Sequence, residues 1–236
     1  MLAAQVELRK IDDLAAEARA QGLAWLTPAE RERLRTITAP ARQEAFLAGH
    51  WQARKRAAQR LGLALHSIAW AVQARGRPQL QVAGEALPLH VSISHSDGWL
   101  AVAVADVPVG IDLELPRRPR DWRKLAAFVL TAEEGGDLEA RAERAQAALF
   151  RRLWALKEAH AKRSGQGLGV RAARERCARP TTAASAEAWT WDVGEGALAL
   201  AGVPGLQVQW LAWDWPSPPA GLACWRYADA NPRRRD

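Results

Sequence analysis

The stretch VGIDLEL, residues 109–115, places two acids one position apart within a short apolar run. Side chains alternate between the two faces of a strand, so Asp112 and Glu114 are expected on one face and the apolar side chains on the other. The apolar face predicts a strand that packs on a core. The acidic face sets two like charges side by side. A divalent cation, nearby Lys or Arg side chains, or exposure to water would each offset their repulsion.

Two further strands are predicted directly before this stretch. Leu89, Val91 and Ile93 alternate with polar residues in the first, the turn SDG follows at residues 96–98, and the apolar residues 99–105 form the second. Together with residues 109–115 they predict a small meander. A later region, residues 189–215, alternates in the same way and predicts strands in the second part of the chain.

A pattern that starts a helix occurs twice. TPAE, residues 27–30, and TAEE, residues 131–134, are both capping boxes, with a hydroxyl at the first position and a Glu three residues later. Each precedes a long segment with helical spacing of its apolar residues, at residues 41–60 and 141–163. Each segment therefore predicts a long helix.

The two helical regions correspond position by position. Trp51, Arg54 and Gly62 in the first are matched by Trp154, Lys157 and Gly165 in the second, each 103 residues later. The recurrence predicts a duplicated α+β unit: two similar half-domains, residues 1–115 and 116–236, related by pseudo-two-fold symmetry. Each is expected to combine a small antiparallel sheet with a long helix, and the active site is expected at their interface. Two unrelated helices are the alternative.

Composition restricts the partners and the compartment. The 236 residues are 49% hydrophobic and carry a net charge of +7, which favours anionic partners such as nucleic acid, phosphorylated small molecules or an acidic protein. Cys177 and Cys224 have neither a CxxC spacing nor a neighbouring His, which argues against a zinc site. No signal peptide or membrane-spanning run is recognised, so the protein is expected to be soluble and cytoplasmic.

The duplication fails at one informative position. Lys55 in the first helix corresponds to Glu158 in the second, four residues before Lys162 on the same helix face. Asp112, Glu114 and Glu158 would then supply three carboxylates from two rigid elements, a donor set that suits Mg²⁺, or Mn²⁺ as an alternative. The competing interpretations are a surface salt bridge between Glu158 and Lys162 and a solvated edge strand for the two other acids.

Two short segments carry candidate phosphate contacts. Ser94, His95 and Ser96 stand at a predicted strand end, where a hydrogen-bonding or cationic His could hold a phosphate. Arg77 stands in a turn between Gly and Pro. A local turn is the structural alternative for both segments.

Three blocks of the chain carry a family resemblance. HVSISHSDGWLAVAVA (90–105), VGIDLE (109–114) and WALKEAHAKRSGQGL (154–168) resemble the signature blocks of the 4′-phosphopantetheinyl transferase superfamily. The length and the inferred duplication resemble the monomeric, surfactin-synthetase-activating type. The similarity spans about residues 25–170.

The resemblance implies an activity and a set of site residues. Family members transfer the 4′-phosphopantetheine arm of coenzyme A to a serine of a carrier protein with Mg²⁺, and release adenosine 3′,5′-bisphosphate. By resemblance, Asp112, Glu114 and Glu158 hold the metal, and Glu158, or secondly Glu134, is the catalytic base. Glu134 also completes a capping box. The resemblance further assigns contacts with coenzyme A to Arg42, Arg54, Arg77, Ser94, His95, Lys157 and Lys162, and Lys162 also assists the leaving bisphosphate.

The partners implied are coenzyme A and acyl or peptidyl carrier proteins, with a monomeric enzyme and no nucleic acid or membrane. Two other functions fit the basic charge. One is another Mg²⁺-dependent enzyme acting on phosphates, such as a nuclease with the same acids. The other is a non-catalytic nucleic-acid-binding protein, although no helix-turn-helix, zinc finger or aromatic RNA-binding motif is recognised.

Overall fold

The computed structural model describes residues 2–73, 78–116 and 122–230. The helices are α1 (Ile11–Ala20), α2 (Pro28–Thr36), α3 (Pro40–Leu61), α4 (Trp122–Val129), α5 (Ala132–Glu139), α6 (Glu143–Ser164) and α7 (Val170–Glu175). The strands are β1 (Ala3–Lys10), β2 (Ile68–Val72), β3 (Pro78–Val82), β4 (Glu85–Ala86), β5 (His90–Ser96), β6 (Trp99–Ala105), β7 (Gly110–Glu114), β8 (Arg176–Pro180), β9 (Ala188–Val193), β10 (Gly196–Ala201), β11 (Gln207–Trp213) and β12 (Ala220–Asp229). No helix within the described ranges is long and apolar enough to cross a lipid bilayer.

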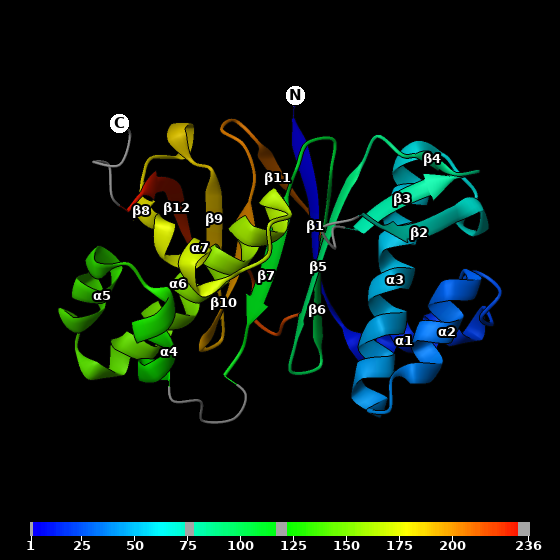
Figure 1. Cartoon of the computed structure of the whole chain (residues 1–236). Coiled ribbons are helices and arrows are strands. Elements are labelled where there is room, and N and C mark those ends of the chain that lie inside the picture. Colours follow the sequence, from blue (N-terminus) through cyan, green and yellow to red (C-terminus); the bar gives the residue numbers. More distant parts are fainter. Residues whose placement is uncertain (1, 74–77, 117–121, 231–236) are drawn as a thin grey trace.

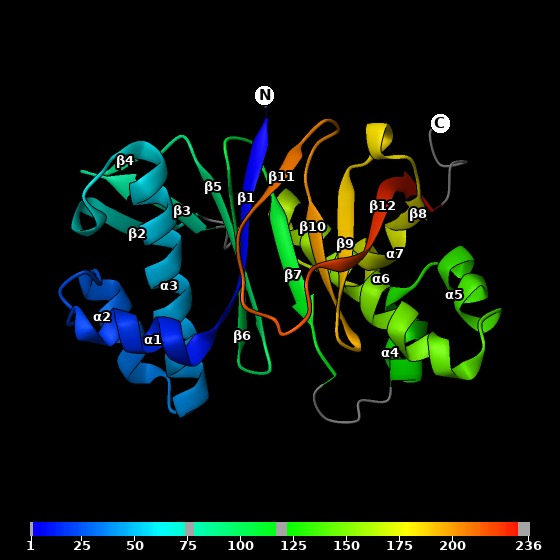
Figure 2. The ribbon, with the colours of Figure 1, turned by 180° about the vertical axis from the view of Figure 1, so that it is seen from behind.

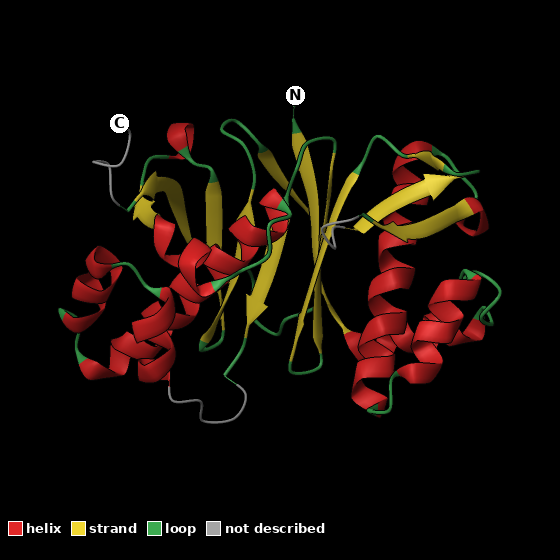
Figure 3. Cartoon of the chain, in the orientation of Figure 1, coloured by secondary structure: helices red, strands yellow, loops and turns green. Residues whose placement is uncertain are grey.

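Strands occupy the middle of the molecule and helices flank them on two sides. In Figure 1, α1, α2 and α3 lie at one side of the strands and α4 to α7 at the other. The colouring by secondary structure in Figure 3 shows the same separation, with the small β2–β3–β4 sheet beside α3. This arrangement confirms the α+β class expected from the sequence.

In the described part of the chain the strands form three sheets. Their orders are β11-β1-β6-β5, β7-β10-β9-β12-β8 and β2-β3-β4. The described pairs are antiparallel apart from β1 and β11, which run parallel. The sequence pattern predicted neither β1 nor its pairing with β11, which lies far away in the chain and beside β1 in space (Figure 2).

The predicted meander is only partly formed. β5 and β6 make the expected hairpin, but β7 leaves it and pairs with β10 in the second sheet. Conversely, β11 of the C-terminal part pairs with β1 in the first sheet. Alternation identifies a strand but carries no information on its partner, which is why the sequence did not predict this exchange.

The two sheets share a core that explains the apolar side of VGIDLEL. Ile111 and Leu113 are 0% and 1% exposed and belong to a cluster with residues of β1, β6, β9 and β10. Separate clusters lie between each sheet and its long helix. The predicted division of side chains between the two faces of β7 is thus confirmed on its apolar side.

The two long helices have matching ends. Helices α3 and α6 are both 22 residues long, and each ends at a glycine in the left-handed conformation, Gly62 with φ 65° and Gly165 with φ 70°. Left-handed backbone is accessible to Gly without the penalty that other residues incur. Both predicted capping boxes also form, at Thr27 with Glu30 and at Thr131 with Glu134.

Candidate active site

Asp112 lies at the junction between the two larger sheets. The residue is 4% exposed, and its Oδ1 accepts hydrogen bonds from Ser94 Oγ at 2.8 Å and from Lys162 Nζ at 2.7 Å. Its other oxygen, Oδ2, is buried without a hydrogen-bond partner among the described residues. A buried carboxylate oxygen without a partner is costly, so this atom is an acceptor available to a ligand.

Helix α6 brings Glu158 and Lys162 to Asp112. Lys162 Nζ also donates to the carbonyl of Ile111 at 3.1 Å, which ties the helix to β7. The approach is close because residue 110 is glycine: a Cβ there would lie 2.0 Å from the carbonyl oxygen of Ala159. The glycine of the GIDLE motif therefore lets the strand that carries Asp112 contact the helix that carries Glu158 directly.

The pKa of Glu158 depends on its burial and on its charged neighbours. Burial raises the pKa of Glu158, and the negative charge of Asp112 raises it further, while Lys162 opposes the rise. Two carboxylates that repel each other in a partly buried site favour either a shared proton or a cation. The interpretation of Glu158 and Lys162 as an isolated surface salt bridge is therefore insufficient, because Lys162 bonds to Asp112.

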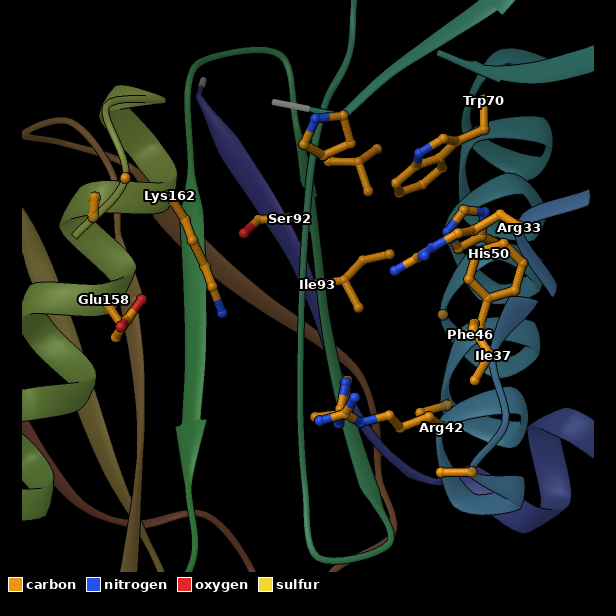
Figure 4. A pocket seen from close by; sticks show the side chains of 18 of the residues that line it. Arg33, Ile37, Arg42, Phe46, His50, Trp70, Ser92, Ile93, Glu158 and Lys162 are labelled. Atoms are coloured by element: carbon orange, nitrogen blue, oxygen red, sulfur yellow. The ribbon is translucent and has the colours of Figure 1, made fainter. Parts of the chain in front are cut away.

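A cavity of about 840 Å³ opens between the two halves of the chain. In Figure 4, Glu158 and Lys162 extend from α6 on one side, and Ser92 and Ile93 of β5 lie between them and the side chains of α2 and α3. His95 lines the same cavity. Its size suits a drug-sized or cofactor-sized ligand.

The opposite wall of the cavity is basic and aromatic. Arg33 at the end of α2 and Arg42 at the start of α3 both line it and are exposed. Phe46, His50 and Trp70 form a stack, with ring centroids 4.0 Å and 4.2 Å apart and planes inclined by 27° in each pair. Of these side chains only Arg42 was predicted as a site residue. Arg33 had no distinguishing signal among the several arginines of its helix.

Arg54 is not placed on this wall. It is 0% exposed, and its guanidinium donates to Glu30 at 2.6 Å, to the carbonyl of Ile68 at 2.9 Å and to the carbonyl of His50 at 3.1 Å. The expectation that Arg54 reaches a nucleotide conflicts with this burial. Its position on a long basic helix indicated a cation but not that the cation points inward.

Lys157 and Glu134 form the equivalent buried pair in the second half. Lys157 Nζ lies 2.8 Å from Glu134 and donates to the carbonyls of Ala173 and Arg176, so the three ammonium protons all have acceptors. Glu134 is 1% exposed and accepts backbone N–H bonds from Thr131 and Ala178. As the structure stands, Lys157 has no donor left for coenzyme A and Glu134 does not line the cavity.

The three predicted metal ligands are not gathered into one cluster. Within the described ranges, no group of three His, Cys, Asp or Glu side chains lies close enough to hold a metal ion in the present conformation. Asp112 and Glu158 nevertheless fit a hard cation, since both are oxygen donors and Asp112 Oδ2 lacks a partner. Glu114 is half-buried on the same strand and has other interactions. Arg77 lies outside the described residues.

The chain is similar to known proteins in the segment that builds this site. The family model described as "4′-phosphopantetheinyl transferase superfamily" matches residues 108–197. A 4′-phosphopantetheinyl transferase of Bacillus subtilis is 32% identical over 149 residues, which cover 63% of this chain and 64% of that protein. The transferase Sfp of Bacillus subtilis strain 168 is 27% identical over 157 residues, covering 66% of this chain and 68% of Sfp.

The similarity to solved structures is weaker. A crystal structure of a holo-(acyl-carrier-protein) synthase from Bacillus anthracis str. Ames in complex with CoA (3′,5′-ADP) is 21% identical, with a TM-score of 0.37. It covers 44% of this chain and 96% of the synthase, and at this score nothing further follows from it. Among the sequence relatives, the match to the Bacillus subtilis transferase that is 32% identical covers 64% of that protein, a little under two thirds. By the match of residues 108–197 and by these relatives, the chain is similar to the 4′-phosphopantetheinyl transferase superfamily.

Proposed function

We propose that this protein transfers the 4′-phosphopantetheine arm of coenzyme A to a serine of an acyl or peptidyl carrier protein and releases adenosine 3′,5′-bisphosphate. The observation that carries the proposal is the cavity between the two halves. Its α6 wall carries Glu158 and Lys162 beside buried Asp112, and the opposite wall, from α2 and α3, carries the exposed Arg33 and Arg42. The names of the relatives, which are phosphopantetheinyl transferases, support the same activity.

The basic groups of the cavity are proposed to bind the phosphates. Arg33, Arg42 and Lys162 line it as cations, which an anionic nucleotide needs because its own charges repel one another, and His95 lines it as a further hydrogen-bonding group. Lys162 would exchange its bond with Asp112 for one with the leaving bisphosphate. A preorganised cation beside a developing negative charge raises the rate by a factor of about 10²–10³.

We propose that Asp112 and Glu158, with Glu114 as a third candidate, hold a Mg²⁺ ion, for which Mn²⁺ can substitute. When bound, the ion would neutralise the diphosphate and polarise the phosphorus under attack. Ser94 and Lys162 keep Asp112 in place.

The carrier serine needs a base, and Glu158 is the group proposed for it. Its carboxylate lines the cavity near Asp112, where it can accept the proton of the serine hydroxyl. The serine oxygen forms the new bond to phosphorus, its proton passes to Glu158, and the bond to the bisphosphate breaks. Glu134 is left out of this role because its carboxylate is already saturated in a buried ion pair.

Further parts of the proposal concern assembly and setting. We propose that residues 1–115 and 116–236 are two half-domains that exchange β7 and β11, that the protein acts as a cytoplasmic monomer, and that it recognises neither nucleic acid nor membranes. The net charge of +7 would favour an acidic carrier protein.

The test is direct. The protein is incubated with coenzyme A, Mg²⁺ and an apo carrier protein, and the carrier is weighed by mass spectrometry. A gain of one phosphopantetheine arm is expected, and its absence with fatty-acid, polyketide and peptide carriers would contradict the proposal. Cleavage of DNA or RNA under the same conditions without coenzyme A would favour the nuclease alternative instead.

A further inference from the structure

Three serines stand at alternate positions of β5 and contact β7. Their hydroxyls accept backbone N–H bonds from β7 and the residue that follows it, in the pairs Ser92 with Ile111 at 2.9 Å, Ser94 with Leu113 at 3.2 Å and Ser96 with Leu115 at 3.2 Å. All three serines are between 4% and 6% exposed. Figure 4 shows Ser92 extending from β5 toward β7.

This row of side-chain bonds joins two sheet edges. β5 is the last strand of one sheet and β7 the first strand of the other, so the two do not share a backbone ladder. Every second N–H of a strand points to the same edge, and buried N–H groups without acceptors are rare. The serine hydroxyls supply those acceptors, and the spacing of two along both strands keeps the register.

The middle serine has an additional partner. Ser94 Oγ donates its single hydroxyl proton to Asp112 Oδ1 at 2.8 Å while it accepts from Leu113. A serine hydroxyl has one proton, so Ser94 cannot donate to a phosphate while it holds Asp112. The expected contact of Ser94 with coenzyme A would require this hydrogen bond to break.

We propose that Ser94 is a positioning residue: it fixes the Asp112 carboxylate at the junction of the two halves so that Oδ2 faces the cation site. The proposal rests on the metal role given to Asp112 in the proposed function. Ser94 and Lys162 both occupy Oδ1, and Oδ2 is the oxygen without a partner. Partners that orient a metal ligand contribute about 10–100-fold to metal affinity.

The chain provides a matched control for this role. Ser96 is buried like Ser94 and accepts its backbone bond at the same distance, two residues further along the strand. Ser94→Ala and Ser96→Ala both leave a β7 N–H without its acceptor, so both are expected to lower the melting temperature by similar amounts.

The experiment compares Mg²⁺ binding. Mg²⁺ is titrated calorimetrically into the full chain saturated with coenzyme A, for the wild type, Ser94→Ala and Ser96→Ala. Ser94→Ala is expected to bind Mg²⁺ about 10–100-fold more weakly with an unchanged KM for coenzyme A, and Ser96→Ala is expected to bind like the wild type. If Ser94→Ala does not fold, Ser94→Cys, whose thiol is a weak donor, is expected to weaken Mg²⁺ binding in the same direction.

Two outcomes overturn the inference. Mg²⁺ affinity equal to the wild type in a folded Ser94→Ala protein would remove the positioning role. A raised KM for coenzyme A with unchanged Mg²⁺ affinity would instead make Ser94 a coenzyme contact. A wild-type protein that binds no Mg²⁺ at all would contradict the metal assignment of the proposed function itself, which separates the two failures.

Discussion

The long helices α3 and α6 are built alike and differ at one decisive position. In each, a buried base pairs with the Glu of the preceding capping box, Arg54 with Glu30 and Lys157 with Glu134. The next residue is Lys55 in α3, which pairs with Glu17 of α1. In α6 it is Glu158, which lines the cavity near Asp112. The buried pair therefore serves the fold in both halves, and the chemistry depends on the residue beside it.

Breaking the buried pairs should have the largest effect on stability. Arg54→Met and Lys157→Met each leave a carboxylate that is almost fully buried without its counter-charge, and such losses cost about 3–5 kcal/mol. Urea unfolding of each variant should show this decrease in the free energy of unfolding. A Lys157→Met protein that is as stable as the wild type but unable to transfer the phosphopantetheine arm would contradict a structural role for the pair in α6.

Substituting the residue after each buried base, Lys55 in α3 and Glu158 in α6, should affect activity only in α6. Glu158→Gln is expected to lower kcat by about 10²–10³, because it removes a charge that the transition state requires. Lys55→Met, at the corresponding position, should keep its activity and lose less than about 1 kcal/mol, since its partner is more than a third exposed. Steady-state transfer rates measured on both variants check this, and equal losses of activity would remove the distinction.

Two glycines test how closely each helix approaches its strand. A Cβ at Gly110 would meet the α6 backbone at 2.0 Å, so Gly110→Ala should cost at least about 1–3 kcal/mol and reduce transfer. A Cβ at Gly49 of α3 would meet the Ile93 side chain at 3.3 Å. Gly49→Ala should change stability little, because the helical gain of about 0.5–1 kcal/mol offsets the tighter contact. Thermal melts of the two variants measure the difference, and a smaller loss at Gly110 would contradict it.

The pH dependence should have opposite signs in the two halves. Burial raises the pKa of Glu30, but hydrogen bonds from His50 and Arg54 outweigh it and bring the pKa down to about 2. The contribution of Glu30 to stability is thus present above its ordinary pKa of 4.5 and is lost as the pH falls toward 2. Burial and Asp112 raise the pKa of Glu158, so its contribution is present below 4.5 and is lost as the pH rises through the raised pKa.

Glu158→Gln should consequently be more stable than the wild type at neutral pH in metal-free buffer, with no such gain at pH 4. Glu30→Gln should be less stable at neutral pH, with the deficit shrinking in acid. Melting temperatures recorded from pH 3 to pH 8 measure both effects. A Glu158→Gln protein that is less stable at pH 7 would contradict the environment described for Glu158.

Local patterns predicted much of this architecture. The capping boxes at Thr27 and Thr131, the helix ends at Gly62 and Gly165 and the alternation in β7 depend on short-range physics, and all appear in the structure. Strand partners depend on long-range packing. For that reason the pairing of β7 with β10 and of β1 with β11 could not be predicted from spacing.

In the candidate site, too, residue types could be predicted from the sequence, but contacts made by long-range packing could not. The sequence identified Asp112, Glu158 and Lys162, and the structure brings Lys162 to Asp112. It could not tell which cations point inward, because Arg54 and Lys157 become structural only through partners that folding supplies. Nor could it predict the stack of Phe46, His50 and Trp70, which depends on how helix α3 packs against strand β2.

The central claim is that a carboxylate from β7 and one from α6 act together at the junction of the halves. The most direct measurement is the mass of an apo carrier protein after incubation with coenzyme A, Mg²⁺ and either the wild type or Asp112→Asn. We expect the phosphopantetheine arm on the carrier with the wild type and none with Asp112→Asn, in a variant that still melts cooperatively. Modification by Asp112→Asn at close to the wild-type rate would contradict it.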